Sequence, residues 1–384
     1  MPKHLISGNM LTLLKNGESY FPRLCADIDA AQQSVHIETY IFSSDETGQS
    51  VAQSLSRAAE RGVKVFLLLD GFGSADLSDD IVDGMRMAGV AILWFRRQTS
   101  LISLKRNRLR RMHRKLAVID GKIAFVGGIN IINDIPDELR GEAPRLDYAV
   151  RMQGELADEM LKAMQHLWGV VSWASFQKRK IKPEWKHKNE KSHEDSHAQL
   201  VLRDNLRHRR DIERTYLKAI AKAEREIVIA NAYFLPGRLF PRALAHAVKR
   251  GVRVILLLQG RVEYRLQHYA TLALYQRLIR AGVEIYEYHA SYMHAKVAVI
   301  DGHWATVGSS NIDPFSMLLA LEANIVVRDE DFAEELHTSL LEAIEVDARR
   351  VVLADISTLR FFISRVIYVL IRFVIGLLGL TKRH

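Results

Sequence analysis

The chain of 384 residues is long enough for two ordinary domains or for one large protein with two lobes. Its single cysteine excludes an intrachain disulfide, and its first residues contain no continuous apolar run that predicts a cleavable signal peptide. The 48% apolar and 26% charged residues indicate a folded globular protein, and the net charge of +9 predicts an anionic partner, either nucleic acid or an anionic membrane surface.

Similar segments recur in the same order in the two halves of the chain. The runs at 34–42 and 226–236 are rich in β-branched and aromatic residues and predict strands. Each is followed by a predicted helix that ends at a glycine and by a continuous apolar run, which is typical of a strand buried on both faces. A second helix, glycine and strand follow at 85–95 and 278–288. This repetition predicts two lobes of common architecture.

The longest match between the halves aligns residues 112–130 with 293–311 without a gap. Predicted strands at 146–152 and 321–327 follow, and each leads into a helix. Strands that alternate with helices favour an α/β fold. We therefore expect two pseudo-symmetric lobes, each a mixed sheet flanked by helices.

Four segments are predicted along the chain. Residues 1–170 form a first lobe, 171–200 a basic linker, 201–350 a second lobe, and 351–384 an apolar tail that contains arginines. Arg365 and Arg372 of the tail lie seven residues apart and so share a helical face, which favours a helix lying in a membrane interface. The alternative is a helix that packs on the protein body or on another copy.

Each half contains one His-x-Lys-x4-Asp-Gly motif, followed by an asparagine 17 positions after the histidine. In strands, residues i and i+2 point to one face, so each histidine projects together with its lysine. The motif occurs at matching positions in the two halves and is followed by the same asparagine, which favours a catalytic role over a structural one. The residues concerned are His113, Lys115, Asp120 and Asn130 in the first half, and His294, Lys296, Asp301 and Asn311 in the second.

These residue types suit phosphoryl transfer. The two lysines and two asparagine amides would donate to phosphoryl oxygens as negative charge builds on them. One histidine would attack phosphorus, while the other protonates the leaving alkoxide and later deprotonates the acceptor hydroxyl. Asp147 and Glu322 occupy matching places on the next strand, and we expect them to hold the tautomers of the two imidazoles. Asp120 and Asp301 each precede a glycine in a predicted tight turn, which favours a bracing role.

The remaining histidines show no metal-ligand spacing, and no acidic cluster predicts a divalent cation. The chemistry outlined above needs no metal and no cofactor.

The paired motifs identify the chain as similar to the phospholipase D superfamily over roughly residues 8–350. Within that superfamily it resembles the bacterial cardiolipin synthases, most closely those of the B type. The segments that carry the resemblance are DGFGSADLSDD (70–80), RRMHRK (110–115), the run at 211–237, HWATVGSSNIDPFSMLLALEAN (303–324), and LLKNGESYFPRL near the start.

The resemblance implies two α/β lobes with one active site at their interface. The implied reaction moves a phosphatidyl group from one phosphatidylglycerol to the hydroxyl of a second phospholipid, which gives cardiolipin and releases glycerol without a metal. By carry-over, the active residues are His113, Lys115, Asp120, His294, Lys296 and Asp301. In the superfamily the first histidine is often the nucleophile, which would be His113 here. The near-symmetry of the halves leaves that choice open.

The halves differ in the segment before the motif, where His113 lies 24 positions after Gly89 but His294 lies only 12 positions after Gly282. The additional residues are strongly basic. We expect four of them to dock the protein on an anionic phospholipid membrane containing phosphatidylglycerol: Lys105, Arg106, Arg108 and Arg110. A solvated loop is the alternative. The expected location is peripheral, on the cytoplasmic face of the bacterial inner membrane.

Two other classes of function are weaker alternatives. A nuclease of the same superfamily would explain the basic charge but not the apolar tail, so no nucleic-acid partner is expected. A non-catalytic scaffold is disfavoured because both motifs are intact. The acceptor lipid, the ratio of transfer to hydrolysis and the oligomeric state are not readable from the sequence.

Overall fold

The computed structural model of the protein describes residues 5–96, 110–135, 143–175, 197–204, 208–262, 265–313, 316, 319–353, 364, 366–367 and 369–370. The expected docking residues Lys105, Arg106 and Arg108 lie outside these ranges, as do most of the expected linker and most of the tail. The two ends of the predicted 171–200 linker are regular structure, because helix α4 continues to Ala174 and strand β8 begins at His197.

The first lobe is built around a seven-stranded sheet. Its strands are β1 (Met10–Lys15), β2 (Ser34–Thr39), β3 (Lys64–Asp70), β4 (Ala91–Phe95), β5 (Leu116–Ile119), β6 (Ile123–Gly127) and β7 (Tyr148–Gln153). Its helices are α1 (Asn16–Asp29), α2 (Glu46–Glu60), α3 (Asp79–Met87) and α4 (Glu155–Ala174).

The second lobe repeats this plan around an eight-stranded sheet. Its strands are β8 (His197–Arg203), β9 (Glu226–Asn231), β10 (Arg253–Gln259), β11 (Glu284–Tyr288), β12 (Lys296–Ile300), β13 (Trp304–Gly308), β14 (Glu322–Arg328) and β15 (Ala348–Arg350). Its helices are α5 (Asp211–Lys222), α6 (Leu239–Lys249), α7 (Arg265–Arg280) and α9 (Glu330–Asp347).

Both sheets are mixed, and their orders correspond. The first runs β1-β7-β6-β5-β2-β3-β4 and the second β15-β11-β10-β9-β12-β13-β14-β8. In each lobe three strands connected through helices are parallel, β2-β3-β4 and β9-β10-β11, and the motif hairpin pairs antiparallel beside them. The expected fold, two pseudo-symmetric α/β lobes with mixed sheets and flanking helices, is confirmed.

Two glycines show why these helices end where the pattern predicted. Gly62 and Gly251 follow α2 and α6 with φ of 89° and 91°, in the left-handed region that a residue without a β-carbon adopts at low cost. The chain then turns directly into β3 and β10. Most residues of β3 and all but the first residue of β10 are buried, as expected for strands covered on both faces.

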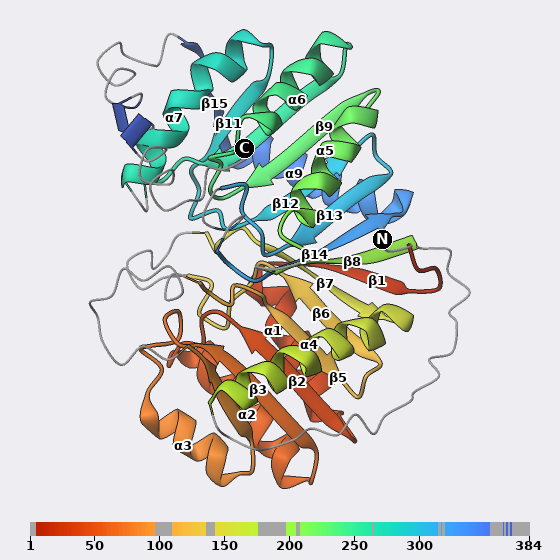
Figure 1. Cartoon of the computed structure of the whole chain (residues 1–384), viewed down its shortest axis with the longest axis vertical. Helices are drawn as coiled ribbons and strands as arrows, with labels where there is room; N and C mark the ends of the chain where they lie inside the picture. Colours follow the sequence, from red (N-terminus) through yellow and green to blue (C-terminus); the bar gives the residue numbers. More distant parts are fainter. Residues whose placement is uncertain are drawn as a thin grey trace.

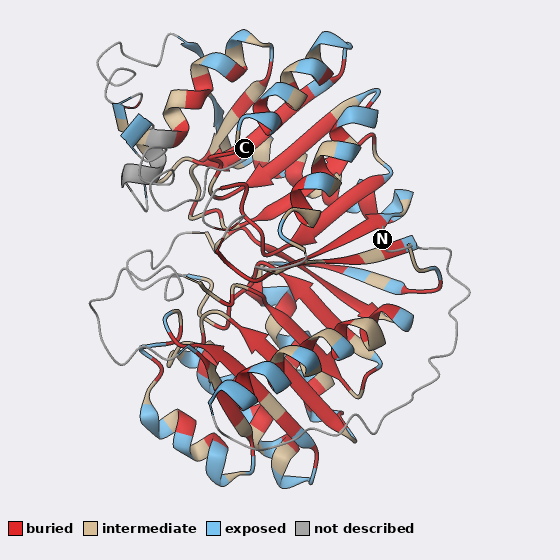
Figure 2. Cartoon of the chain, in the orientation of Figure 1, coloured by how far each residue is buried: buried red, intermediate tan, exposed pale blue. Residues whose placement is uncertain are grey.

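Helices lie on both faces of each sheet (Figure 1), and most residues of the strands are buried between them (Figure 2). Residues of α1, α2 and α3 form the outer core of the first lobe, and residues of α5, α6 and α7 that of the second. The largest core contains residues from both sheets and from α4 and α9. Burial of this apolar surface fixes the two lobes against each other.

Candidate active site

The two motif hairpins, β5–β6 and β12–β13, present their histidines from the extended segments that lead into β5 and β12. His113 and Lys115 precede the first residue of β5, and His294 lies two residues before Lys296, which begins β12. In an extended chain residues i and i+2 share a face. Each histidine therefore lies beside its lysine, as the spacing predicted.

The segment that carries each histidine pairs with the other lobe. Met112 forms a parallel bridge with Leu321, and the N–H of His113 donates to the carbonyl of Leu321 at 2.9 Å. Leu146 and Met293 repeat this bridge, and the N–H of His294 donates to the carbonyl of Leu146 at 2.8 Å. Two isolated parallel bridges thus join the lobes at the point where the motifs begin.

These two bridges between the lobes decide which carboxylate holds which histidine. Nδ1 of His113 lies 3.1 Å from Oε2 of Glu322, and Nδ1 of His294 lies 2.6 Å from Oδ2 of Asp147. Each imidazole therefore pairs with the carboxylate of the opposite lobe. Pairing through Nδ1 places the proton there and leaves Nε2 with its lone pair for chemistry.

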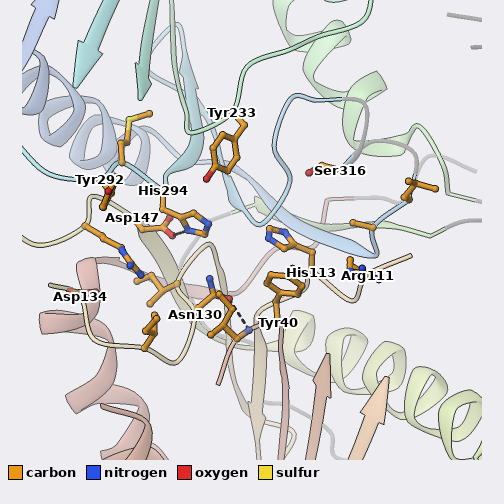
Figure 3. A pocket seen from close by; sticks show the side chains of 17 residues that line it. Tyr40, Arg111, His113, Asn130, Asp134, Asp147, Tyr233, Tyr292, His294 and Ser316 are labelled. Carbon is orange, nitrogen blue, oxygen red and sulfur yellow. Dashed lines mark hydrogen bonds and ion pairs between the residues drawn. The ribbon is translucent and has the colours of Figure 1, made fainter. Parts of the chain in front are cut away.

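The two imidazoles face each other across one cavity of about 430 Å³ (Figure 3). Their ring centroids are 6.5 Å apart. Asn130, Asp147 and Tyr40 also line this cavity, and the Tyr40 ring packs edge-on to His113 at 4.8 Å. A cavity of this volume accommodates a small polar headgroup.

The two lysines lie behind the histidines and are buried. Nζ of Lys115 donates to the carbonyl of His113 at 2.9 Å and lies 5.3 Å from the centroid of the Tyr40 ring. Lys296 donates to the carbonyl of His294 in the corresponding way. The two motifs therefore bring two ammonium groups to the same buried centre.

The two asparagines of the motifs occupy different surroundings. Oδ1 of Asn130 accepts from the backbone N–H of Ile41 at 3.2 Å, which fixes the amide at the cavity wall. Asn311 is buried, and its Oδ1 has no hydrogen-bond partner among the described residues.

Asp120 and Asp301, which the resemblance placed among the active residues, lie at the far ends of β5 and β12 from the histidines. Asp120 accepts from the backbone N–H groups of 32, 33 and 34 at 2.7 to 2.9 Å, and Asp301 from those of 224, 225 and 226 at 2.8 to 2.9 Å. Both adopt positive φ, 52° and 55°, in the turn before the glycine. In these contacts both carboxylates hold the backbone that leads into a neighbouring strand, which fits the bracing role that the turn predicted.

The family model described as "Cardiolipin synthase, PLD-like domain" matches residues 24–168 and 216–343, which include both motifs. The chain belongs to this family of PLD-like cardiolipin synthases. The expectation of a phosphatidyl-transferring enzyme with a phospholipase D-type fold is thereby confirmed at the level of the family.

Curated cardiolipin synthases are similar to this family member over most of its length. It is 41% identical to cardiolipin synthase B of Escherichia coli (strain K12) and 42% identical to that of Salmonella typhi, each over 347 residues. Each match covers 90% of this chain and 82% of the relative. Among solved structures, phosphatidylserine synthase of Haemophilus influenzae Rd KW20 superimposes with a TM-score of 0.70 at 13% identity, covering 99% of this chain and 97% of that one. At this identity the likeness concerns the fold.

Burial and neighbouring cations control the protonation of the site in this cardiolipin synthase family member. Burial, together with Lys115, lowers the pKa of His113, and Glu322 opposes the shift. Burial and Lys296 hold the pKa of His294 well below its ordinary value. Both imidazoles are therefore neutral at neutral pH, the form in which Nε2 can act as nucleophile or base.

Burial shifts the pKa values of two further groups of the site toward neutrality. It lowers the pKa of Lys115 to about 7, with Glu322 opposing the shift and Lys296 adding to it. It raises the pKa of Asp147 to about 6, although Lys296 and the N–H of Tyr148 favour the ionised form. Perturbations of this size in one site are typical of active sites.

Several residues that the sequence did not single out support the site. Oγ of Ser309 donates to Glu322 at 2.5 Å, and Arg203 is the cross-strand partner of Glu322, with a buried guanidinium beside that carboxylate. The N–H of Met112 donates to Asp70 at 2.7 Å. The matching N–H in the second lobe donates to Gln259. The repeat alignment, Gly128 with Ser309 and Asp70 with Gln259, was the available signal.

Among the described residues, no three histidine, cysteine, aspartate or glutamate side chains converge as a metal site would require. Within the same described ranges, no helix combines the length and the apolar character needed to cross a bilayer.

Proposed function

We propose that the protein is a cardiolipin synthase that transfers a phosphatidyl group from phosphatidylglycerol to the hydroxyl of a second phospholipid, with release of glycerol. The observation that carries this proposal is the pair of histidines, each held at Nδ1 by a carboxylate of the opposite lobe and facing the other across one cavity. Family membership supports the same reaction.

The first step forms a covalent intermediate on one histidine. Nε2 of the nucleophile attacks phosphorus, and the bond from phosphorus to the glycerol oxygen breaks. The second histidine, protonated when the anionic diester binds beside it, gives its proton to the glycerol oxygen. The resemblance to the superfamily favours His113 as the nucleophile, with His294 as acid and then base.

The second step returns the enzyme to its starting state. His294, now neutral, takes the proton of the acceptor hydroxyl, the acceptor oxygen attacks phosphorus, and the bond from phosphorus to Nε2 of His113 breaks. Lys115 and Lys296, with the amides of Asn130 and Asn311, stabilise the charge that builds on the phosphoryl oxygens. Asp147 and Glu322 hold the imidazoles, and Asp120 and Asp301 brace the hairpins.

The partner implied by this reaction is a phospholipid membrane. We assign the basic residues Lys105, Arg106, Arg108 and Arg110 to docking on anionic lipid, and the protein to a peripheral position on the cytoplasmic face of the inner membrane. The net charge of +9 and the apolar tail support this assignment.

Identification of the lipid products by mass tests the proposal. The purified protein is incubated with vesicles of phosphatidylglycerol that contain phosphatidylethanolamine. Cardiolipin together with free glycerol is the expected product. Phosphatidic acid alone would identify a hydrolase, since water competes with the alcohol for the same intermediate. No conversion of lipid, with hydrolysis of a nucleic acid instead, would contradict the proposal.

A further inference from the structure

The cavity between the histidines contains two arginines in addition to the motif residues. Arg145 precedes Asp147 by two residues, and Arg111 precedes His113 by two residues, so each points to the same face as the catalytic group that follows it. Both line the cavity that the two histidines share. Positive charge therefore reaches the cavity both from the segment that carries His113 and from the segment that carries Asp147.

The two arginines have no arginine at the matching positions of the second lobe. The counterpart of Arg145 in the second lobe is Ala320, and the counterpart of Arg111 is Tyr292, and all four positions line the cavity. Because Leu146 bridges to Met293, the segment that contains Arg145 runs beside His294. The charge of Arg145 acts on both His294 and Asp134.

The backbone holds Arg145 in place. Its N–H donates to the carbonyl of Asp134 at 3.1 Å, the carbonyl of Pro144 accepts from Oγ of Ser291 at 2.5 Å, and the N–H of Leu146 donates to Tyr292 at 3.0 Å. Among the described residues, the guanidinium of Arg145 makes no hydrogen bond or ion pair. By contrast, the guanidinium of Arg111 lies over the Phe72 ring at 4.2 Å.

The proposed reaction requires a second anion in this cavity. The acceptor hydroxyl and the acceptor phosphate belong to one headgroup and are separated by a three-carbon glycerol unit. When the hydroxyl lies at His294, which acts as the base, its phosphate lies close by in a partly desolvated space. A charge in such a space is costly unless a partner of opposite sign pairs with it.

We propose that Arg145 is the subsite for the phosphodiester of the acceptor lipid, and that it selects a phospholipid over glycerol or water as acceptor. This inference rests on the proposed function and deepens it. The guanidinium binds two phosphate oxygens through parallel N–H donors, which also orients the acceptor. The phosphate of the donor lipid binds at Lys115 and Lys296, so the two anions have separate cationic partners.

Competition between two water-soluble acceptors tests the subsite without any contribution from acyl chains. Labelled glycerol and labelled glycerophosphoglycerol carry the same terminal hydroxyl, but only the second has a phosphodiester. Both compete for the same phosphatidyl-enzyme intermediate formed from phosphatidylglycerol. The ratio of the two labelled lipid products therefore measures acceptor selection and is independent of the amount of folded enzyme.

The unmodified protein is expected to prefer glycerophosphoglycerol about tenfold, equivalent to ~1.4 kcal/mol. Arg145→Gln is expected to lower this preference at least fivefold, and Arg145→Lys to retain part of it. Arg86→Gln removes one exposed positive charge on α3 and serves as the matched control, with an unchanged ratio. An unchanged product ratio in Arg145→Gln would overturn the assignment of the subsite to Arg145. The same holds if Arg111→Gln loses the preference while Arg145→Gln keeps it.

The same assay separates the failure of this inference from the failure of the proposed function. If neither acceptor yields a labelled lipid with the unmodified protein, phosphatidyl transfer itself is wrong. If both yield labelled lipid in equal amounts, transfer stands and the phosphate subsite is wrong.

Discussion

His294 and Asp147 come from different lobes, and Nδ1 of the histidine lies 2.6 Å from Oδ2 of the aspartate. The pair exists only because Leu146 bridges to Met293 across the lobe boundary. A carboxylate that holds an imidazole in the reactive tautomer contributes strongly to catalysis. The geometry therefore makes each histidine dependent on the lobe that does not contain it.

Asp147→Asn is expected to lower the turnover number about 100-fold or more, because the neutral amide neither fixes the Nδ1 proton nor stabilises an imidazolium. Glu322→Gln is expected to act in the same way on His113. Steady-state formation of cardiolipin measures both effects. Asp83→Asn, an exposed change on α3, is the matched control. Retention of most of the activity by both variants would contradict the pairing.

His113→Ala and His294→Ala are each expected to abolish turnover while the fold survives, as judged by circular dichroism and thermal melting. Each imidazole supplies half of one cavity within a single chain, so a mixture of the two variants should remain inactive. Retention of most activity by either variant would exclude the composite site. Recovery of activity on mixing would show that the site is shared between chains.

Lys115→Met is expected to inactivate the enzyme and to stabilise the fold by about 1–3 kcal/mol at pH 6, because a buried ammonium is costly. The pKa of Lys115 in the folded protein is about 7, below its ordinary value of 10.5. Between these values the unfolded chain binds a proton that the folded chain does not, so this group makes stability rise with pH.

The advantage of Lys115→Met should accordingly be largest below pH 7 and shrink as the pH rises toward 10.5. Chemical denaturation of both proteins at pH 6 and pH 9 measures the difference. A variant less stable than the unmodified protein at pH 6 would show that the ammonium is stabilising in the folded state.

The joint change of Lys105, Arg106, Arg108 and Arg110 to serine is expected to weaken binding to phosphatidylglycerol vesicles severalfold. Near an anionic surface each cationic residue contributes about 1 kcal/mol, and salt screens that attraction. Vesicle cosedimentation at low and high salt measures the effect. Activity on a detergent-solubilised short-chain lipid should change far less, since docking is then unnecessary. Equal losses on both substrates would place these residues in the chemistry or the fold.

Strong chelation with EDTA is expected to leave the rate nearly unchanged. Two lysines and two asparagines supply the positive charge and the donors that the phosphoryl group needs. Initial rates before and after dialysis against the chelator provide the measurement. A collapse in rate that one divalent metal restores would show that the site has been misread.

The sequence by itself determined the repeat, the mixed α/β lobes and the pairing of each histidine with its lysine. These features depend on local patterns: the two-residue period of a strand, the glycine after a helix, and a motif present twice in register. The turn position of Asp120 and Asp301 likewise predicted their bracing role, because an aspartate before a glycine is stabilised by nearby backbone groups.

Only the tertiary structure decided which carboxylate holds which histidine and which further side chains reach the cavity. The sequence places Asp147 after the motif of the first lobe, yet the bridge between Leu146 and Met293 brings its carboxylate to His294 of the other lobe. Arg145 reaches His294 through the same bridge, and Tyr40 reaches His113 from the end of β2 in its own lobe; neither segment contains a motif. Contacts between lobes follow from burial of a core shared by both sheets, and that packing has no signature in the spacing of residues along one chain.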